Sequence, residues 1–190
     1  EEQRALASAR VAAAGLSDRV AIELRDYRQV DGQYQRIVSV EMIEAVGREF
    51  WPGFFQAIDR ALAPGGRVGL QAITIPDGRF DQYVQHADWI QKHIFPGGLL
   101  PCLREVCAVT AAHTRLAVTH VEDRPLDYAA TLAAWRTRFF ERLDEVKQMG
   151  FDDRFIRTWE YYFASCEAAF RTRNLGLLHL TLSRVGEDLA

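Results

Sequence analysis

The chain has 190 residues, of which 48% are hydrophobic and 26% are charged, and its formal net charge is -3. This length is typical of one domain with a sizeable core, and the composition is that of a globular protein. The slightly acidic balance gives no support to a nucleic-acid-binding surface, which would need a basic stripe. The sequence has no apolar run long enough to span a bilayer.

The three cysteines, Cys102, Cys107 and Cys166, are too irregularly spaced for a disulfide framework and are odd in number. Such cysteines favour a reducing cytoplasm. Cys102 and Cys107 precede His113 and His120 in the sequence, but they do not form the CxxC pair typical of a structural zinc site. We therefore expect buried thiols, ordinary histidines and no metal.

The first expected elements are a helix and a strand. Residues 1–14 are rich in alanine and begin with two acids, which favours a helix and suits the positive end of its dipole. Gly15 ends this helix. Residues 20–24 alternate as a strand does, and this strand is expected to end at Asp26 and Tyr27.

The next strand, expected over residues 36–42, brings the first candidate for chemistry. It contains a short apolar run typical of a buried parallel strand, and Glu41 and Glu44 stand where it should give way to a loop. In open α/β sheets the ligand lies beyond the carboxyl ends of the strands, so Glu44 is the first residue that we expect in a site. The alternative is a carboxylate favoured by a helix N-terminus. Glu41 is expected to face either a cofactor or solvent.

A crossover connection follows this strand. Apolar residues recur every three or four positions over residues 51–62, which predicts a helix, and Pro64 with the glycines after it breaks that helix. Residues 68–75 form the next buried strand. Strand, helix and strand in this order predict a βαβ crossover and therefore a parallel, doubly wound sheet.

Residues 80–112 interrupt the alternation of strands and helices. They form an apolar helical stretch that carries Trp89, Ile94 and Phe95 and stops at the Pro-Gly-rich residues 96–101. The stretch lies between two strands and near their carboxyl ends. Two interpretations stay equal: a helical insertion that covers a substrate, or a layer that simply packs on the sheet.

The rest of the chain predicts a strand over residues 116–124, two amphipathic helices and a final strand over residues 177–184. Aromatic residues recur at helical spacing in both helices, which indicates core. The sequence thus predicts an α/β fold in a single domain over residues 1–190. We expect His86, His93 and His179 to be structural or surface residues.

Five segments form a set that points to a known family. They are SVEMIEAVG at residues 39–47, LAPGG at 62–66, WIQKHIFPGGLLP at 89–101, DYAATLAAW at 127–135 and YYFASCEAAFRTR at 161–173. Together they resemble the cyclopropane-fatty-acyl-phospholipid synthases, which are S-adenosylmethionine-dependent methyltransferases with a Rossmann-like fold. IFPGG and FRTR are the most specific parts, and the resemblance runs through nearly the whole chain.

The resemblance implies a Rossmann-like sheet that is mostly parallel with an antiparallel last strand. It also implies that the chain is the C-terminal two-thirds of such an enzyme and lacks the N-terminal cofactor-binding strands. Of the cofactor contacts that remain, it places Gln3 near the adenine and Asp26 and Tyr27 further along the same pocket. We expect the chain alone to bind S-adenosylmethionine weakly. The alternative from another class is a non-catalytic fragment that binds no cofactor.

The reaction of this family needs an anion. An alkene attacks the sulfonium methyl, and the resulting carbocation must lose a proton for a ring to close. The resemblance implies that a bound bicarbonate ion fills this role, held by Glu44, Gln71, the backbone of Ile73 and Tyr128. Gln71 stands where the family has histidine, and Ala45 where it often has another. Glutamine can donate a hydrogen bond but cannot relay a proton as histidine can.

The expected function is therefore the synthesis of cyclopropane fatty acids on the unsaturated acyl chains of phospholipids. The alternative within enzymes is methyl transfer to another lipid or a small-molecule acceptor without ring closure. The expected partners are phospholipid acyl chains at the membrane surface and no nucleic acid, with self-association left open. The expected location is the cytoplasm, peripheral to the inner membrane.

Overall fold

The computed structural model describes residues 1–187, and the chain falls into two units. The first unit, Glu1–Gly32, contains helix α1 (Glu2–Ala13) and the 3-10 turn η1 (Tyr27–Gln29). The second unit begins at Gln33 and contains the sheet with the remaining helices. The single domain that the sequence predicts stays a prediction.

The strand predicted for residues 20–24 is wrong, because these residues have no regular secondary structure. Val20 and Leu24 are 39% and 64% exposed. The four strands of the described sheet do not include this segment. An extended segment without a pairing strand leaves its backbone N–H and C=O groups to water. Strand-like alternation of side chains over these five residues is therefore not enough to predict a strand.

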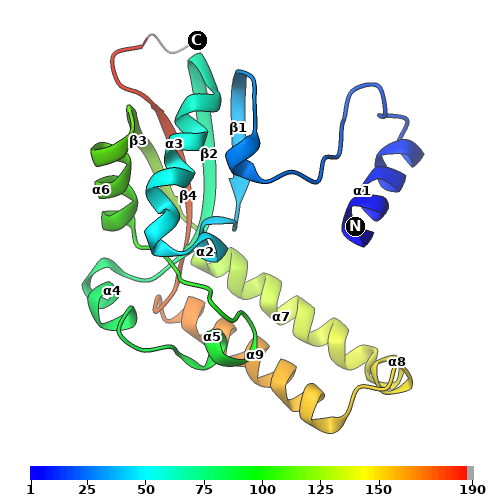
Figure 1. Ribbon diagram of the computed structural model, residues 1–190. Coiled ribbons are helices and arrows are strands. Elements are labelled where there is room, and N and C mark those ends of the chain that lie inside the picture. The colour runs from blue at the N-terminus through cyan, green and yellow to red at the C-terminus, as the bar shows by residue number, and fades with distance from the viewer. Residues whose placement is uncertain (188–190) are drawn as a thin grey trace. The chain divides into compact units, whose positions relative to one another are not determined.

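The second unit is built on a four-stranded mixed sheet in the order β1-β2-β4-β3 (Figure 1). β1 (Tyr34–Val40) pairs in parallel with β2 (Leu62–Thr74), and β4 (Gly176–Arg184) lies between β2 and β3 (Leu116–Asp123), antiparallel to both. Three strands thus share one direction, and the last strand in sequence opposes them. This confirms the predicted α/β class with a mostly parallel sheet and an antiparallel last strand.

Helices connect these strands in three groups. Between β1 and β2 lie α2 (Ile43–Val46), η2 (Arg48–Phe50) and α3 (Trp51–Ala61). Between β2 and β3 lie α4 (Asp77–Tyr83), α5 (Trp89–His93) and α6 (Leu103–His113). Between β3 and β4 lie α7 (Pro125–Glu141), α8 (Leu143–Gln148) and α9 (Asp153–Arg171).

The insertion predicted at residues 80–112 is helical, as expected, since it contains most of α4 together with α5 and most of α6. Its role as a cover for a substrate stays a prediction. In the part of the chain that the structure describes, we find no helix that is both long and apolar enough to cross a membrane.

Helix α3 forms because its apolar side chains recur on one face. Trp51, Phe54, Phe55 and Ile58 are all less than a tenth exposed, and burial of such a stripe supplies most of a helix's stability. The helix ends at Ala61 and β2 follows at once. The LAPGG segment therefore begins a strand, where the sequence predicts a break before one.

A second core lies where α7, α9 and β4 meet. α7 and α9 lie side by side along much of their length (Figure 1). Their buried cluster consists of Ala129, Leu132, Tyr162, Phe163, Cys166, Phe170 and Leu177. The aromatic stripes read from the sequence are thus confirmed as core. This packing also fixes the position of Tyr128, which packs against the cluster.

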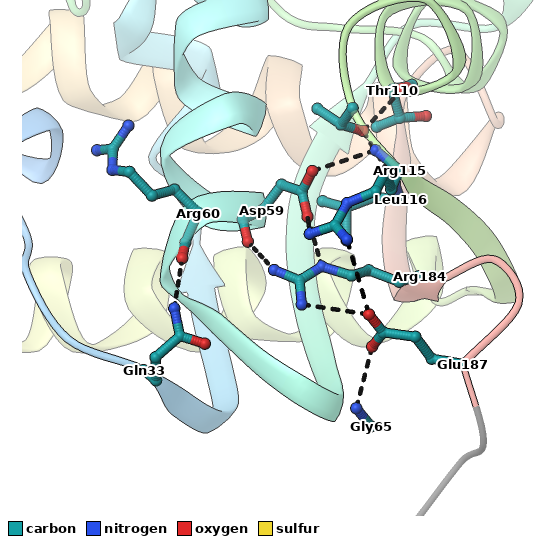
Figure 2. A network of polar contacts seen from close by, with 10 residues as sticks. Gln33, Asp59, Arg60, Gly65, Thr110, Arg115, Leu116, Arg184 and Glu187 are labelled. Carbon is teal, nitrogen blue, oxygen red and sulfur yellow. Dashed lines mark hydrogen bonds and ion pairs between the residues drawn. The ribbon is translucent and has the colours of Figure 1, made fainter.

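A buried arginine near the C-terminal end of β4 joins this strand to α3 (Figure 2). Arg184 is 7% exposed. Its Nε donates to Asp59 Oδ1 over 2.6 Å, its Nη2 donates to the backbone carbonyl of Asp59, and its Nη1 lies 3.4 Å from Glu187 Oε1. Arg115 adds a backbone N–H bond to Asp59 Oδ2. The guanidinium is therefore paired and hydrogen-bonded, as a buried charge must be.

Candidate functional site

Two carboxylates lie at the carboxyl end of β1, as the sequence predicts. The strand ends at Val40, and Glu41 continues its backbone pairing by donating its N–H to the carbonyl of Gln71 over 2.9 Å. Glu41 has a positive φ of 50°, which turns the chain into the short helix α2. Glu44 lies in the first turn of α2. Both side chains thus stand beside β2.

The carboxylate of Glu44 is held by the neighbouring strand. Its Oε1 accepts the backbone N–H of Ile73 over 2.7 Å, while its Oε2 is buried and has no hydrogen-bond partner. Its backbone carbonyl accepts the N–H of Leu99 over 2.8 Å, which connects the segment between α5 and α6 to this edge. Glu44 and Ile73 are therefore in contact.

Burial raises the pKa of Glu44 to about 7, although the N–H groups of Ile73 and of its own backbone favour the charged form; the charge of Glu41 raises it further. A buried oxygen without a donor is costly as an anion. Glu44 is therefore a carboxyl group that changes its protonation state near neutral pH, which is typical of a group at a functional site.

Glu41 is the centre of a second set of contacts. Its Oε1 accepts from Gln71 Nε2 over 2.7 Å, and its Oε2 accepts from the Tyr128 hydroxyl over 3.0 Å. Because a carboxylate only accepts, the amide nitrogen of Gln71 must face Glu41. The amide oxygen of Gln71 then lies 2.8 Å from His179 Nε2, which must be the donor. The contacts of Gln71 with Glu41 and His179 thus determine how the Gln71 amide is oriented and place a proton on Nε2 of His179.

Tyr128 reaches this set from α7. Its ring packs on Phe170 at a centroid distance of 4.8 Å and meets Trp135 edge-on at 6.2 Å. Burial raises the pKa of the Tyr128 hydroxyl, and the negative charge of Glu41 raises it further. The hydroxyl therefore stays protonated and acts as a donor to Glu41.

A cavity of about 400 Å³ opens beside these residues. Polar groups from β2, α7, β4 and the residue that follows β1 line it together with apolar surface. Its lining includes Glu41, Gln71, Tyr128 and His179, which carry the polar contacts above, and the apolar side chains of Trp135 and Leu177. An apolar cavity with a few convergent polar groups is the usual form of a small-molecule site.

The predicted site residues form two sets of contacts, one around Glu44 and one around Glu41. Glu44 contacts Ile73, and Gln71 contacts Tyr128 through Glu41, so the structure brings the four predicted side chains and backbone groups to one edge of the sheet. That they act in catalysis stays a prediction.

The predicted cofactor residues, Gln3, Asp26 and Tyr27, belong to the first unit. Gln3 is exposed on α1, and Asp26 caps η1 with both carboxylate oxygens bonded to Arg28. Hydrogen bonds from Arg28 lower the pKa of Asp26 to about 2. Their role with a cofactor stays a prediction.

Sequence reasoning missed two residues of the site. The sequence does not decide whether Glu41 faces a cofactor or solvent, and it predicts His179 to be a structural or surface residue. The register of β2 and β4 places His179 directly opposite Gln71. Glutamine in a buried strand needs a polar partner, which is the one signal that could have directed attention to a neighbouring strand.

Within residues 1–187, no group of three or more His, Cys, Asp and Glu side chains could hold an ion. Cys102 and Cys166 are buried thiols and Cys107 is an exposed one.

Comparison with known proteins shows the family. Residues 1–180 match the family described as mycolic acid cyclopropane synthetase, and the chain belongs to it. The chain is 49% identical to the tuberculostearic acid methyltransferase UfaA1 of Mycobacterium tuberculosis, over 97% of this chain and 43% of that protein. It is 37% identical to the cyclopropane-fatty-acyl-phospholipid synthase of Escherichia coli, over 89% of this chain and 42% of that protein. The resemblance seen in the sequence is thus confirmed, and the chain spans about two-fifths of these relatives.

Solved structures agree on the fold. The cyclopropane synthase MmaA2 of M. tuberculosis superposes with a TM-score of 0.77 at 23% identity, over 93% of this chain and 66% of that chain. The mycolic acid cyclopropane synthase CmaA1, in a complex with SAH and CTAB, gives a TM-score of 0.75 at 23% identity, over 93% and 65%. These structures share the α/β architecture described above.

The raised pKa of Glu44 predicts a pH-dependent stability. Because its folded-state pKa of about 7 lies above its ordinary value of 4.5, its contribution to the free energy of unfolding is fully present below pH 4.5 and is lost as the pH rises through 7. The loss is on the order of 3 kcal/mol. Urea unfolding of the full-length protein at pH 5 and pH 8 should show a smaller loss in Glu44→Gln than in the wild type. Equal losses in both would show that Glu44 ionises normally.

Proposed function

We propose that the full-length protein transfers a one-carbon unit from S-adenosylmethionine to the double bond of unsaturated acyl chains in phospholipids. Family membership supports methyl transfer, and the names of the M. tuberculosis and E. coli relatives, a methyltransferase and a synthase of cyclopropane lipids, support a fatty-acyl substrate. The complex of CmaA1 with SAH supports the cofactor.

The observation that carries this proposal is the pair of carboxylates at the carboxyl end of β1. An alkene is a weak nucleophile, and its reaction with an electrophilic methyl group leaves positive charge on the acyl chain. Glu41 and Glu44 place negative charge where a parallel sheet holds its ligand. The Oε2 atom of Glu44 is buried and unpaired, so its charge acts in a setting that screens it weakly.

The negative charge of these carboxylates also suits a positively charged cofactor. When bound, S-adenosylmethionine supplies an electrophilic methyl group on a positively charged sulfur. The unpaired Oε2 of Glu44 favours such a cation beside it. The resemblance separately assigns Gln3, Asp26 and Tyr27 to cofactor binding, and both carboxylate oxygens of Asp26 are bonded to Arg28.

Bicarbonate fits these residues poorly. Of the donors that the resemblance assigns to it, Gln71 and Tyr128 already donate to Glu41, and the N–H of Ile73 donates to Glu44. Among these three groups only the Gln71 amide keeps a second N–H, and an added anion would also face two carboxyl groups of the chain.

The fate of the acyl cation separates two products. Loss of a proton from the new methyl group with ring closure gives a cyclopropane, as in the name of the E. coli relative. Methylation without ring closure is the second candidate, supported by the name of the M. tuberculosis relative and by Gln71, which cannot relay a proton.

We further propose that the substrate is taken from the surface of the inner membrane on its cytoplasmic side. Large apolar side chains are exposed on and near α7 and α9, and such surfaces suit contact with lipid. The exposed residues are Leu126, Trp135, Phe140, Met149, Phe151 and Tyr161.

Lipid analysis of a host with and without the full-length gene tests the proposed function. We expect unsaturated acyl chains to gain the mass of one methylene group when the gene is expressed. Feeding methionine with a CD₃ methyl group should leave two deuterium atoms on a cyclopropane product, because ring closure removes one hydron from the new methyl group. Proton NMR then distinguishes a ring from a branched alkene. Lipids unchanged by expression in a host that makes unsaturated phospholipids would contradict the proposal.

A further inference from the structure

Glu41 has a backbone conformation that side chains rarely adopt. Its φ of 50° lies in the left-handed region, and Arg173 is the only other described non-glycine residue with a positive φ. Glycine would adopt this conformation without strain. A strained residue at the carboxyl end of a strand is a signal of function, because strain persists where the side chain is needed.

The side chain of Glu41 occupies donors that an external anion would otherwise use. Gln71 Nε2 and the Tyr128 hydroxyl donate to its two oxygens over 2.7 and 3.0 Å. His179 holds Gln71 from the far side, so the amide cannot turn away without losing a bond. The carboxylate is thus held in one position by three strands and a helix.

Glu41, unlike Glu44, is a carboxylate that a substrate can reach; the other carboxylate of the cavity, Asp127, is paired with Arg124 over 2.8 Å. It lines the 400 Å³ cavity together with Trp135 and Leu177, which offer apolar surface to an acyl chain. Glu44 is not among the residues that line this cavity. Of the two carboxylates, Glu41 is therefore placed to meet a proton on the substrate, and Glu44 supplies charge from behind.

We propose that Glu41 is the built-in base of the reaction and takes the place of a bound bicarbonate ion. This inference rests on the proposed function. Gln71, Tyr128 and His179 are positioning residues for the Glu41 carboxylate. The protein therefore needs no external anion for turnover.

The π electrons of the acyl double bond form a new bond to the methyl carbon as the bond between that carbon and the sulfonium sulfur breaks, which moves the positive charge to the acyl chain. A C–H bond of the cation then breaks, its proton goes to a carboxylate oxygen of Glu41, and its electron pair forms the new C–C bond of a ring or of an alkene. Proton transfer to solvent restores Glu41.

Two variants of Glu41 separate its chemistry from its structure. Glu41→Gly removes the carboxylate, relieves the positive φ and leaves space between Gln71 and Tyr128 for a small anion. Glu41→Gln has nearly the same shape, fills that space and lacks a base. Folding of both is checked by circular dichroism and thermal melting, and Glu41→Gly should melt no lower than the wild type.

Turnover of the full-length protein is measured with S-adenosylmethionine and vesicles of unsaturated phospholipid, in buffer freed of carbon dioxide. We expect the wild type to keep its rate without bicarbonate and to gain less than about twofold when bicarbonate is added. Both variants should lose about 10²-fold or more. Adding bicarbonate or formate should restore Glu41→Gly by about tenfold or more and leave Glu41→Gln unchanged.

The outcomes separate the inference from the proposed function. A wild type that methylates lipid only when bicarbonate is present overturns the inference and leaves the proposed function in place. Near-normal turnover of Glu41→Gly without added anion also overturns the inference. A wild type that methylates no lipid under any of these conditions overturns the proposed function, and the inference with it.

Discussion

Glu44→Gln is expected to lower the turnover of the full-length protein by about 10²-fold or more, because the variant removes a negative charge next to the developing cation. The oxygen of glutamine can still accept the N–H of Ile73, so the local structure should persist. Because the pKa of Glu44 is about 7, the difference between wild type and variant should grow as the pH rises from 6 to 8. Initial rates of the wild type and of Glu44→Gln, taken at saturating lipid and cofactor from pH 6 to 8, measure this difference.

Glu49→Gln is the matched control for this variant. Glu49 follows Glu44 by five positions and is exposed, so the same chemical change removes a charge that water already screens. Its rate should stay within about twofold of the wild type. If Glu44→Gln also kept a nearly normal rate, Glu44 would be a structural carboxyl group and not part of the reaction.

Arg184→Met is expected to destabilise the protein by about 3 kcal/mol or more. The substitution keeps a long apolar stem but leaves Asp59, whose side chain is 15% exposed, without the guanidinium shown in Figure 2. Burial by itself raises the pKa of Asp59, and its bonds to Arg184 and Arg115 lower it below the ordinary value. Without Arg184, the cost of the buried charge is no longer offset. Urea unfolding at pH 7 measures the change.

Arg115→Met provides the comparison within the same network. The side chain of Arg115 is 65% exposed and lies 3.7 Å from Asp59, so this ion pair should contribute less than about 1 kcal/mol. The backbone N–H of residue 115 can still donate to Asp59. Equal effects of the two substitutions would show that burial does not distinguish these arginines.

Local patterns in the sequence determined much of the fold. The apolar spacing over residues 51–62 predicted α3, and the aromatic stripes predicted the core between α7 and α9. The short apolar runs predicted β2 and β4. Such elements are readable because a buried face repeats every 3.6 residues in a helix and a strand needs only a short apolar run.

Pairing between distant segments was decided by the tertiary structure. Residues 20–24 have the alternation of a strand but no neighbouring strand in the described sheet, so they stay irregular. Conversely, LAPGG looks like a break between helix and strand, yet it begins β2, and its Leu62 pairs with Tyr34 of β1. Alternation describes only side chains, whereas a strand exists only when its backbone groups find partners.

In the candidate site, too, local sequence signals and contacts between distant segments have to be distinguished. From a strand end and family-like segments, the sequence predicts that Glu44, Gln71, Ile73 and Tyr128 belong to one site, and their joint role stays a prediction. The sequence could not show that Glu41 joins Gln71 to Tyr128, or that His179 stands opposite Gln71. Those contacts depend on a positive φ and on strand register, and a shift of one residue in register would turn His179 to the other face of the sheet. Only the folded chain brings these groups within hydrogen-bonding distance.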